Sequence, residues 1–123
     1  MALPDFKLVV AGGRSFDDLP RTIRILDALL VDKRLTHNIV IVSGLARGAD
    51  SMGYLYALLK DYAVEEYGAQ WDTLGKGAGY ARNIEMLSVA DAVVAFWDHV
   101  SKGTKHAIKM AEKKGLPCRV ILY

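Results

Sequence analysis

The sequence lacks the residues that build covalent or metal-linked frameworks. It contains one cysteine, Cys118, three histidines and three prolines. A single cysteine cannot form an internal disulfide, and its place before the run 119–123 indicates a small apolar side chain in a strand. His37, His99 and His106 show no metal-ligand spacing with one another or with the cysteine. We therefore expect no disulfide, no bound metal and no cofactor.

The chain also lacks long hydrophobic runs and an excess of charge of one sign. No apolar run approaches the roughly 20 residues that a membrane-spanning helix needs, and no charged-then-apolar leader precedes a cleavage site. We therefore expect a soluble, cytoplasmic protein without a membrane partner. The 16 Lys and Arg residues are nearly balanced by 14 Asp and Glu residues, which leaves a formal net charge of +2. With so small and evenly spread a charge, nucleic acid is not an expected partner.

What the sequence does contain is alternating strand and helix patterns within 123 residues, of which 52% are hydrophobic. This length and composition predict a single folded domain over residues 1–123. Short apolar runs predict strands at 7–11, 38–43, 63–67, 91–97 and 117–122, with 63–67 near an edge and 91–97 central. Helical spacing predicts helices at 18–33, from Ala49 onward, at 79–90 and at 107–114, with 101–104 as a polar turn. The fold class is therefore α/β: a Rossmann-like three-layer sandwich, with a parallel sheet of about five strands and helices on both faces.

Glycine-rich polar segments follow three of the predicted strands. In open parallel sheets, ligands bind beyond the carboxyl ends of the strands, so these segments converge at one edge. Glycine lets the backbone approach a ligand, amide and hydroxyl groups donate to phosphate oxygens, and arginine adds charge. The predicted ligand-binding residues here are Gly12, Gly13, Arg14, Ser15, Gly44, Ala46, Arg47, Gly48, Ala49, Asp50, Ser101, Lys102, Gly103 and Thr104.

Each of these segments alone is also consistent with a simple turn. Their joint occurrence favours a site for an anion such as a nucleotide phosphate. The first segment has no third glycine at the offset of the dinucleotide fingerprint, and no lysine of the chain follows the glycine pattern of a Walker loop. Hydride transfer with NAD and hydrolysis of ATP are therefore disfavoured.

Further candidates lie on the helix 79–90 and at the end of the strand 91–97. Arg82, Asn83 and Glu85 come near the start of that helix, where one face could meet the ligand, or Arg82 and Glu85 could form an ordinary surface pair. The indole of Trp97 could stack on a base or fill the edge of the core. The carboxylate of Asp98 could accept from a ribose or cap the next turn.

Four ordered segments of the chain resemble the SLOG superfamily, which unites Smf/DprA proteins and LOG phosphoribohydrolases, and most closely its small YspA-like branch. They are residues 9–16 (VVAGGRSF), 42–51 (VSGLARGADS), 75–86 (GKGAGYARNIEM) and 95–106 (AFWDHVSKGTKH). The resemblance covers nearly the whole chain. It implies a Rossmann-like domain that binds a nucleotide or a nucleotide-derived, ADP-ribose-like ligand at these loops, with His106 beside them.

Enzymes that are similar to this chain cleave the N-glycosidic bond of nucleoside monophosphates, with an arginine on the helix and a glutamate after a glycine-threonine loop. Arg82 matches the arginine, whereas His106 stands near the place of the acidic residue. A histidine cannot replace a carboxylate that stabilises an oxocarbenium-like sugar. Glu85, Asp50 or Asp98 would have to supply that group.

These observations rank three functions. A binding module for a phosphorylated nucleotide-derived ligand, acting as a sensor or carrier, comes first, and a phosphoribohydrolase-like enzyme is the alternative. Handling of single-stranded DNA comes last, because the composition suggests neither a basic groove nor interleaved aromatic residues. We also expect a homodimer, since related domains self-associate and the helix with Tyr54, Tyr56, Leu58 and Leu59 offers apolar surface.

Overall fold

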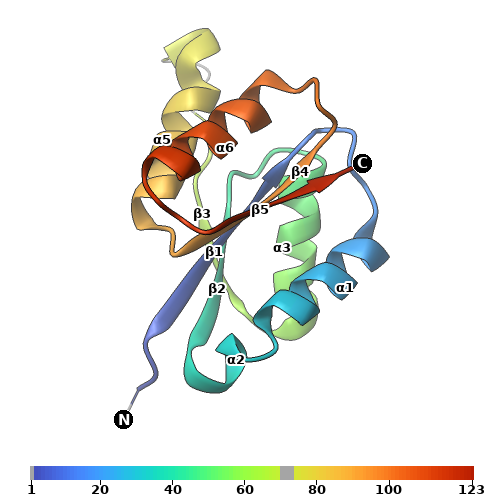
Figure 1. The fold of residues 1–123 in the computed structure, drawn as a ribbon, viewed down its shortest axis with the longest axis vertical. Coiled ribbons are helices and arrows are strands. Elements are labelled where there is room, and N and C mark those ends of the chain that lie inside the picture. Colours follow the sequence, from blue (N-terminus) through green and yellow to red (C-terminus); the bar gives the residue numbers. More distant parts are fainter. Residues whose placement is uncertain (1, 70–73) are drawn as a thin grey trace.

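The sheet at the centre of the molecule has five parallel strands in the order β3-β2-β1-β4-β5 (Figure 1). We describe residues 2–69 and 74–123 in a computed structural model. The strands are β1 (Asp5–Gly12), β2 (Asn38–Ser43), β3 (Ala63–Glu66), β4 (Ala92–Trp97) and β5 (Cys118–Leu122). The α/β Rossmann-like fold is therefore confirmed. The middle strand is β1, not the more uniformly apolar β4, which lies beside it and is also buried.

Helices cover both faces of the sheet (Figure 1). Neighbouring strand residues point to opposite faces, so Val10 belongs to the core cluster with α1 (Leu19–Leu30) and α3 (Ala49–Lys60). Val9 belongs to the second cluster, with α5 (Ala78–Val89) and α6 (Lys102–Lys113). Within the described residues, no helix is long and apolar enough to cross a membrane.

The predicted helix 18–33 is two helices in the structure. Asp18 caps α1, because its Oδ1 accepts the N–H of Arg21 at 3.0 Å. The helix ends at Leu30, and a separate short helix, α2 (Lys33–Thr36), follows. Between β3 and α5, the expected loop 68–79 contains a 3₁₀ turn, η1 (Gly75–Gly77). Residues 70–73 of that loop lie outside the described part.

The strand β3 confirms the expected edge position. An edge strand tolerates two glutamates because one side of it is unpaired. The carboxylate of Glu65 lies 3.0 Å from Lys7 Nζ on β1 and accepts the hydroxyl of Tyr67 at 2.9 Å. These contacts hold the pKa of Glu65 below its usual range.

The start of α6 differs from the prediction. The helix begins at Lys102, so the segment 101–104 is its first turn and not a separate polar turn. The reason is local: Asp98 Oδ1 accepts the N–H groups of Val100 (2.9 Å) and Ser101 (2.8 Å), which turns the chain directly into the helix. A first turn without apolar residues carries no periodic signal.

The apolar surface expected for self-association is only partly exposed. Tyr56 is fully buried in α3 and donates its hydroxyl to Asp27 Oδ1 at 2.7 Å, whereas Leu58 and Leu59 are exposed. The homodimer stays a prediction.

Candidate functional site

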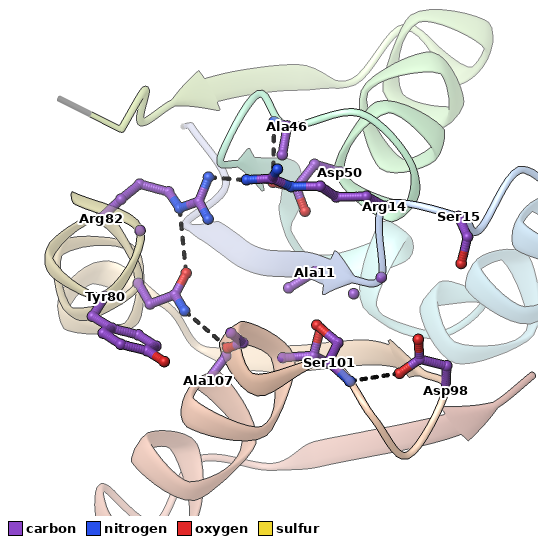
Figure 2. Close-up of a pocket in the computed structure, with 16 residues that line it drawn as sticks. Ala11, Arg14, Ser15, Ala46, Asp50, Tyr80, Arg82, Asp98, Ser101 and Ala107 are labelled. Carbon is purple, nitrogen blue, oxygen red and sulfur yellow. Dashed lines mark hydrogen bonds and ion pairs between the residues drawn. The ribbon is translucent and has the colours of Figure 1, made fainter. Parts of the chain in front are cut away.

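The loops at the carboxyl edge of the sheet enclose one cleft of about 720 Å³ (Figure 2). It lies among the β1 and β2 loops, the start of α5 and the start of α6. Of the residues predicted for the site, those that line it are Gly12, Gly13, Arg14, Ser15, Ala46, Asp50, Arg82, Asn83, Asp98, Ser101, Gly103 and Thr104. The structure thus brings together all three predicted loops and the helix arginine.

A second hollow of about 430 Å³ adjoins the cleft. Two predicted residues that do not line the cleft, Gly44 and Arg47, line this hollow. It shares Arg14, Ala46 and Arg82 with the cleft, so these residues separate the two hollows.

The other predicted residues do not line the cleft. Gly48 has φ +85°, and a Cβ there would meet the backbone of Gly13 and Arg14. Gly48 therefore allows the two loops to pack together and does not contact the cleft. Ala49 is buried in the core. Trp97 donates its indole N–H to the carbonyl of Ser101 at 3.1 Å, which positions the loop before α6.

Three more predicted residues lie beside the cleft or away from it. His106 contacts Asn83 (3.5 Å) and the ring of Tyr80 (centroids 4.5 Å apart), and burial lowers its pKa. Lys102 and Glu85 are exposed and are not among the residues that line the cleft. Glu85 is therefore poorly placed for chemistry there.

The side chains of Ala11, Tyr80 and Ala107 and the backbone of Gly79 complete the cleft, and sequence reasoning missed them. Of these, Tyr80 had a usable signal. It lies in the first turn of a helix whose start was expected at this edge, two residues before Arg82.

Arg82 is fixed on the cleft by three partners. Its Nη1 donates to the carbonyl of Gly44 at 2.9 Å and lies 3.7 Å from Asp50 Oδ2, while its Nε donates to Asn83 Oδ1 at 3.3 Å. A Cβ at Gly44 would lie 2.7 Å from Arg82 and Asp50, so only glycine leaves this pair undisturbed. Within residues 2–69 and 74–123, no ion pair joins Arg82 to Glu85, which differs from the alternative of a surface pair.

Asp50 is a nearly buried carboxyl group on the same side of the cleft. Burial raises its pKa to about 6, although the Arg82 charge, the Ala46 N–H at 3.3 Å and the Arg14 charge all favour the ionised form. At neutral pH, Asp50 therefore carries a negative charge that offsets part of the arginine charge around it.

The start of α6 forms the opposite side of the cleft. The N-cap residue Ser101 makes no side-chain cap, because its hydroxyl lies 3.1 Å from that of Thr104. By helix geometry, the N–H groups of residues 102–104 have no acceptor within the helix, and the positive dipole end of α6 lies at the cleft. Of the two roles predicted for Asp98, contact with a ribose and capping of the next turn, the structure shows the capping role. The N–H groups of Ser101 and Val100 that donate to its carboxylate hold its pKa below the usual range.

One amide in each of the two other loops is already engaged, contrary to expectation. The N–H of Gly13 donates to the carbonyl of Phe96 at 3.0 Å, and that of Ala46 to Asp50. Anion binding at this cleft would therefore rest on Arg14, Arg82 and the first turn of α6, and not on the N–H groups of Gly13 and Ala46.

The fold resembles a solved structure of DNA processing protein A from Helicobacter pylori, a protein described for its single-stranded DNA binding mode. The TM-score is 0.65 at 21% identity, over 94% of this chain and 64% of that one, so the chain spans less than two thirds of that structure.

This comparison overturns two expectations from the sequence. A protein with the same fold binds single-stranded DNA, so nucleic acid cannot be set aside as a partner on the grounds of composition. The ligand prediction, a nucleotide or ADP-ribose-like molecule with phosphoribohydrolase activity as the alternative, is likewise wrong, because the protein of similar fold is described for single-stranded DNA binding and not for a nucleotide. The physical reason is that net charge sums over the whole surface, whereas binding depends on where the charges lie.

The amino-acid sequence itself also has relatives. A "Gene 61 protein" of Mycobacterium phage D29 is 35% identical over 118 residues, which cover 90% of this chain and 92% of the phage protein. The family model described as "YspA, cpYpsA-related SLOG family" matches residues 6–73, more than half of the chain. Because that match covers more than half of the chain, the chain belongs to the YspA, cpYpsA-related SLOG family.

Proposed function

We propose that this protein binds single-stranded DNA, with the strand's backbone and at least one base in the cleft between the β1 and β2 loops and the start of α6. The observation that carries the proposal is the composition of that cleft. It combines two arginines, the first-turn N–H groups of α6, for which the described residues provide no hydrogen-bond acceptor, and an exposed aromatic ring. The resemblance to a DNA-processing protein supports the same class of ligand.

The phosphate groups of the strand fit the cationic part of the cleft. Arg14 and Arg82 lie along one side, and Ser101 lies on the other (Figure 2). Gly103, in the first turn of α6, also lines the cleft. A guanidinium forms paired hydrogen bonds with phosphate oxygens, and the N–H groups at a helix start favour an anion. A phosphate between the two sides can therefore be held by both.

Tyr80 supplies a surface for a base. Its side chain is 42% exposed and lines the cleft from the first turn of α5, with the ring of His106 behind it. Stacking on an aromatic ring tolerates any base, because every base has a π-face. It also requires an unpaired base, which favours a single strand over a duplex.

The test is fluorescence anisotropy of a labelled oligothymidylate at low salt. Arg14→Gln and Arg82→Gln should each weaken binding severalfold. The slope of the logarithm of the binding constant against the logarithm of salt concentration should become shallower by about 0.7 for each lost phosphate contact. Arg24→Gln is the matched control, because Arg24 is an exposed arginine on α1 outside the cleft.

Two results would contradict the proposal. One is an absence of binding by the unmodified protein at about 50 mM salt, where phosphate contacts are strong. The other is binding that both cleft variants leave at the level of Arg24→Gln.

A further inference from the structure

The outer face of α6 carries a row of lysines, which we call the lysine stripe: Lys102, Lys105, Lys109 and Lys113. Their spacings of three, four and four residues place them within about 80° of one another around a helix. All four are exposed. The opposite face of the helix, with Thr104, Ala107, Ile108 and Ala111, is buried against the sheet and α5.

The charge of the stripe is not neutralised locally. Among the residues that the structure describes, no ion pair involves any of the four lysines. The one acidic residue in α6 is Glu112, at the flank of the stripe. Asp98, before the helix, directs a carboxylate oxygen to backbone N–H groups. The stripe is thus a local concentration of positive charge in a chain whose net charge is +2.

The stripe begins at the cleft. Lys102 lies between Ser101 and Gly103, which both line it. From that edge α6 extends along the sheet (Figure 1). The eleven-residue step from Lys102 to Lys113 corresponds to about 17 Å at the helical rise, or about five nucleotides at the spacing of a stacked strand.

We propose that single-stranded DNA leaving the cleft runs along the lysine stripe, which contacts its phosphates and extends the binding site beyond the cleft. This inference rests on the proposed function, and it specifies the direction in which the strand leaves the cleft and the length of the strand that is bound. Lysine is a hydrated point charge on a flexible stem, suited to successive phosphates without reading bases. The exposed residues of α6 include no aromatic or aliphatic side chain, as a protein-binding hot spot or a membrane-surface helix would require.

The test compares two triple variants that remove equal charge. Lys105→Gln/Lys109→Gln/Lys113→Gln removes the stripe beyond the cleft. Arg24→Gln/Lys33→Gln/Arg34→Gln removes three exposed cations from α1 and α2, which do not contact the cleft. Binding is measured by anisotropy for oligothymidylates of about four and about twelve nucleotides, within the range of known single-strand site sizes. Circular dichroism and thermal unfolding check that both variants fold.

For the unmodified protein, affinity should rise clearly from the short to the long oligonucleotide. The stripe variant should bind the short one almost normally and the long one at least tenfold more weakly, and its logarithmic salt slope should fall by about 2. The control variant should keep the gain with length.

Three outcomes separate the two proposals. If the unmodified protein binds neither oligonucleotide, both the proposed function and this inference are overturned. If it binds both, and the stripe variant keeps the same gain with length as the control, the inference alone is overturned. A loss in the stripe variant that is equal for both lengths also overturns it, because that is the behaviour of a distant electrostatic field and not of direct contacts.

Discussion

Two helices, α3 and α6, begin at the same edge of the sheet, yet their starts differ in chemistry. Neither has a side-chain cap on its first N–H groups. The first turn of α3 contains Asp50, a buried carboxyl group that accepts the Ala46 N–H and faces Arg82. The first turn of α6 has no acidic residue and faces the cleft with its own N–H groups. Of these two helix starts at the same edge of the sheet, only that of α6 is therefore open to an external anion, because the carboxylate of Asp50 already lies at the start of α3.

This contrast also assigns different roles to the glycines at the two starts. Gly48, which precedes α3, has φ +85° and lies against the backbone of Gly13 and Arg14. Gly103 lies in the first turn of α6, and a Cβ there would meet nothing within 4 Å beyond its own helix. One glycine is required for folding, and the other leaves room for a ligand.

The largest expected effect is therefore on folding, in Gly48→Ala. Its Cβ would overlap backbone atoms in a region that L-residues rarely adopt, so we expect a loss of about 4 kcal/mol in the free energy of unfolding. Gly103→Ala is the control and should be neutral or stabilising by up to about 1 kcal/mol. Urea denaturation monitored by circular dichroism measures both. Equal effects of the two substitutions would contradict the assignment.

The second effect is a pH dependence of stability that originates at Asp50. Its pKa of about 6 in the folded protein exceeds the ordinary value of 3.8, so the folded state holds the proton more tightly. The protonated carboxyl group therefore contributes up to about 3 kcal/mol to the free energy of unfolding. This contribution is fully present below about pH 4 and is lost as the pH rises through 6.

Urea denaturation at several pH values isolates this contribution as the difference between the unmodified protein and Asp50→Asn. The asparagine cannot ionise, so that difference should change between pH 4 and pH 7. Parallel pH profiles would show that Asp50 titrates normally.

A smaller effect concerns the aromatic surface in the cleft. Tyr80→Ala should weaken oligonucleotide binding by about 1 to 3 kcal/mol, the range for loss of one stacked base. Tyr80→Phe keeps the ring and should bind almost normally. Anisotropy titrations of the two variants decide the matter, and an equal loss in both would assign Tyr80 a hydroxyl contact and not a stacking role.

The smallest effect is a gain of affinity. Asp50→Asn removes the negative charge that offsets Arg82 and Arg14, so binding of the oligonucleotide at pH 7 should tighten severalfold, about 1 kcal/mol. The gain should shrink toward pH 5, where the native carboxyl group is itself largely protonated. Weaker binding at every pH would mean that Asp50 positions the arginine and does not compete with the ligand.

Much of the fold follows from local patterns in the sequence. The run 38–43 predicts β2 at its observed bounds, because a buried parallel strand is a continuous apolar run that ends at glycine. The meeting of the loops at one edge follows from the parallel order of the strands. The start of α6 could not be predicted, since its first turn is polar and its geometry depends on Asp98.

The chemistry of the cleft was harder to predict because it depends on contacts distant in sequence. Nothing near Asp50 in the chain indicates that it is buried beside Arg82. The lysine stripe becomes regular only once residues 102–106 are known to be helical, since Lys102 otherwise lies in a turn and Lys105 lies before the predicted helix. A sum of charges over the chain therefore led to the wrong expectation about nucleic acid.

The most direct test of the central claim is an amide-resolved NMR titration with a short oligothymidylate. We expect the largest shifts at the N–H groups of Lys102, Gly103 and Thr104 and at Tyr80. The N–H groups of Gly13 and Ala46, which are bonded within the protein, should shift less. Shifts confined to the α3 side, or no shifts in the cleft at saturating oligonucleotide, would contradict the account.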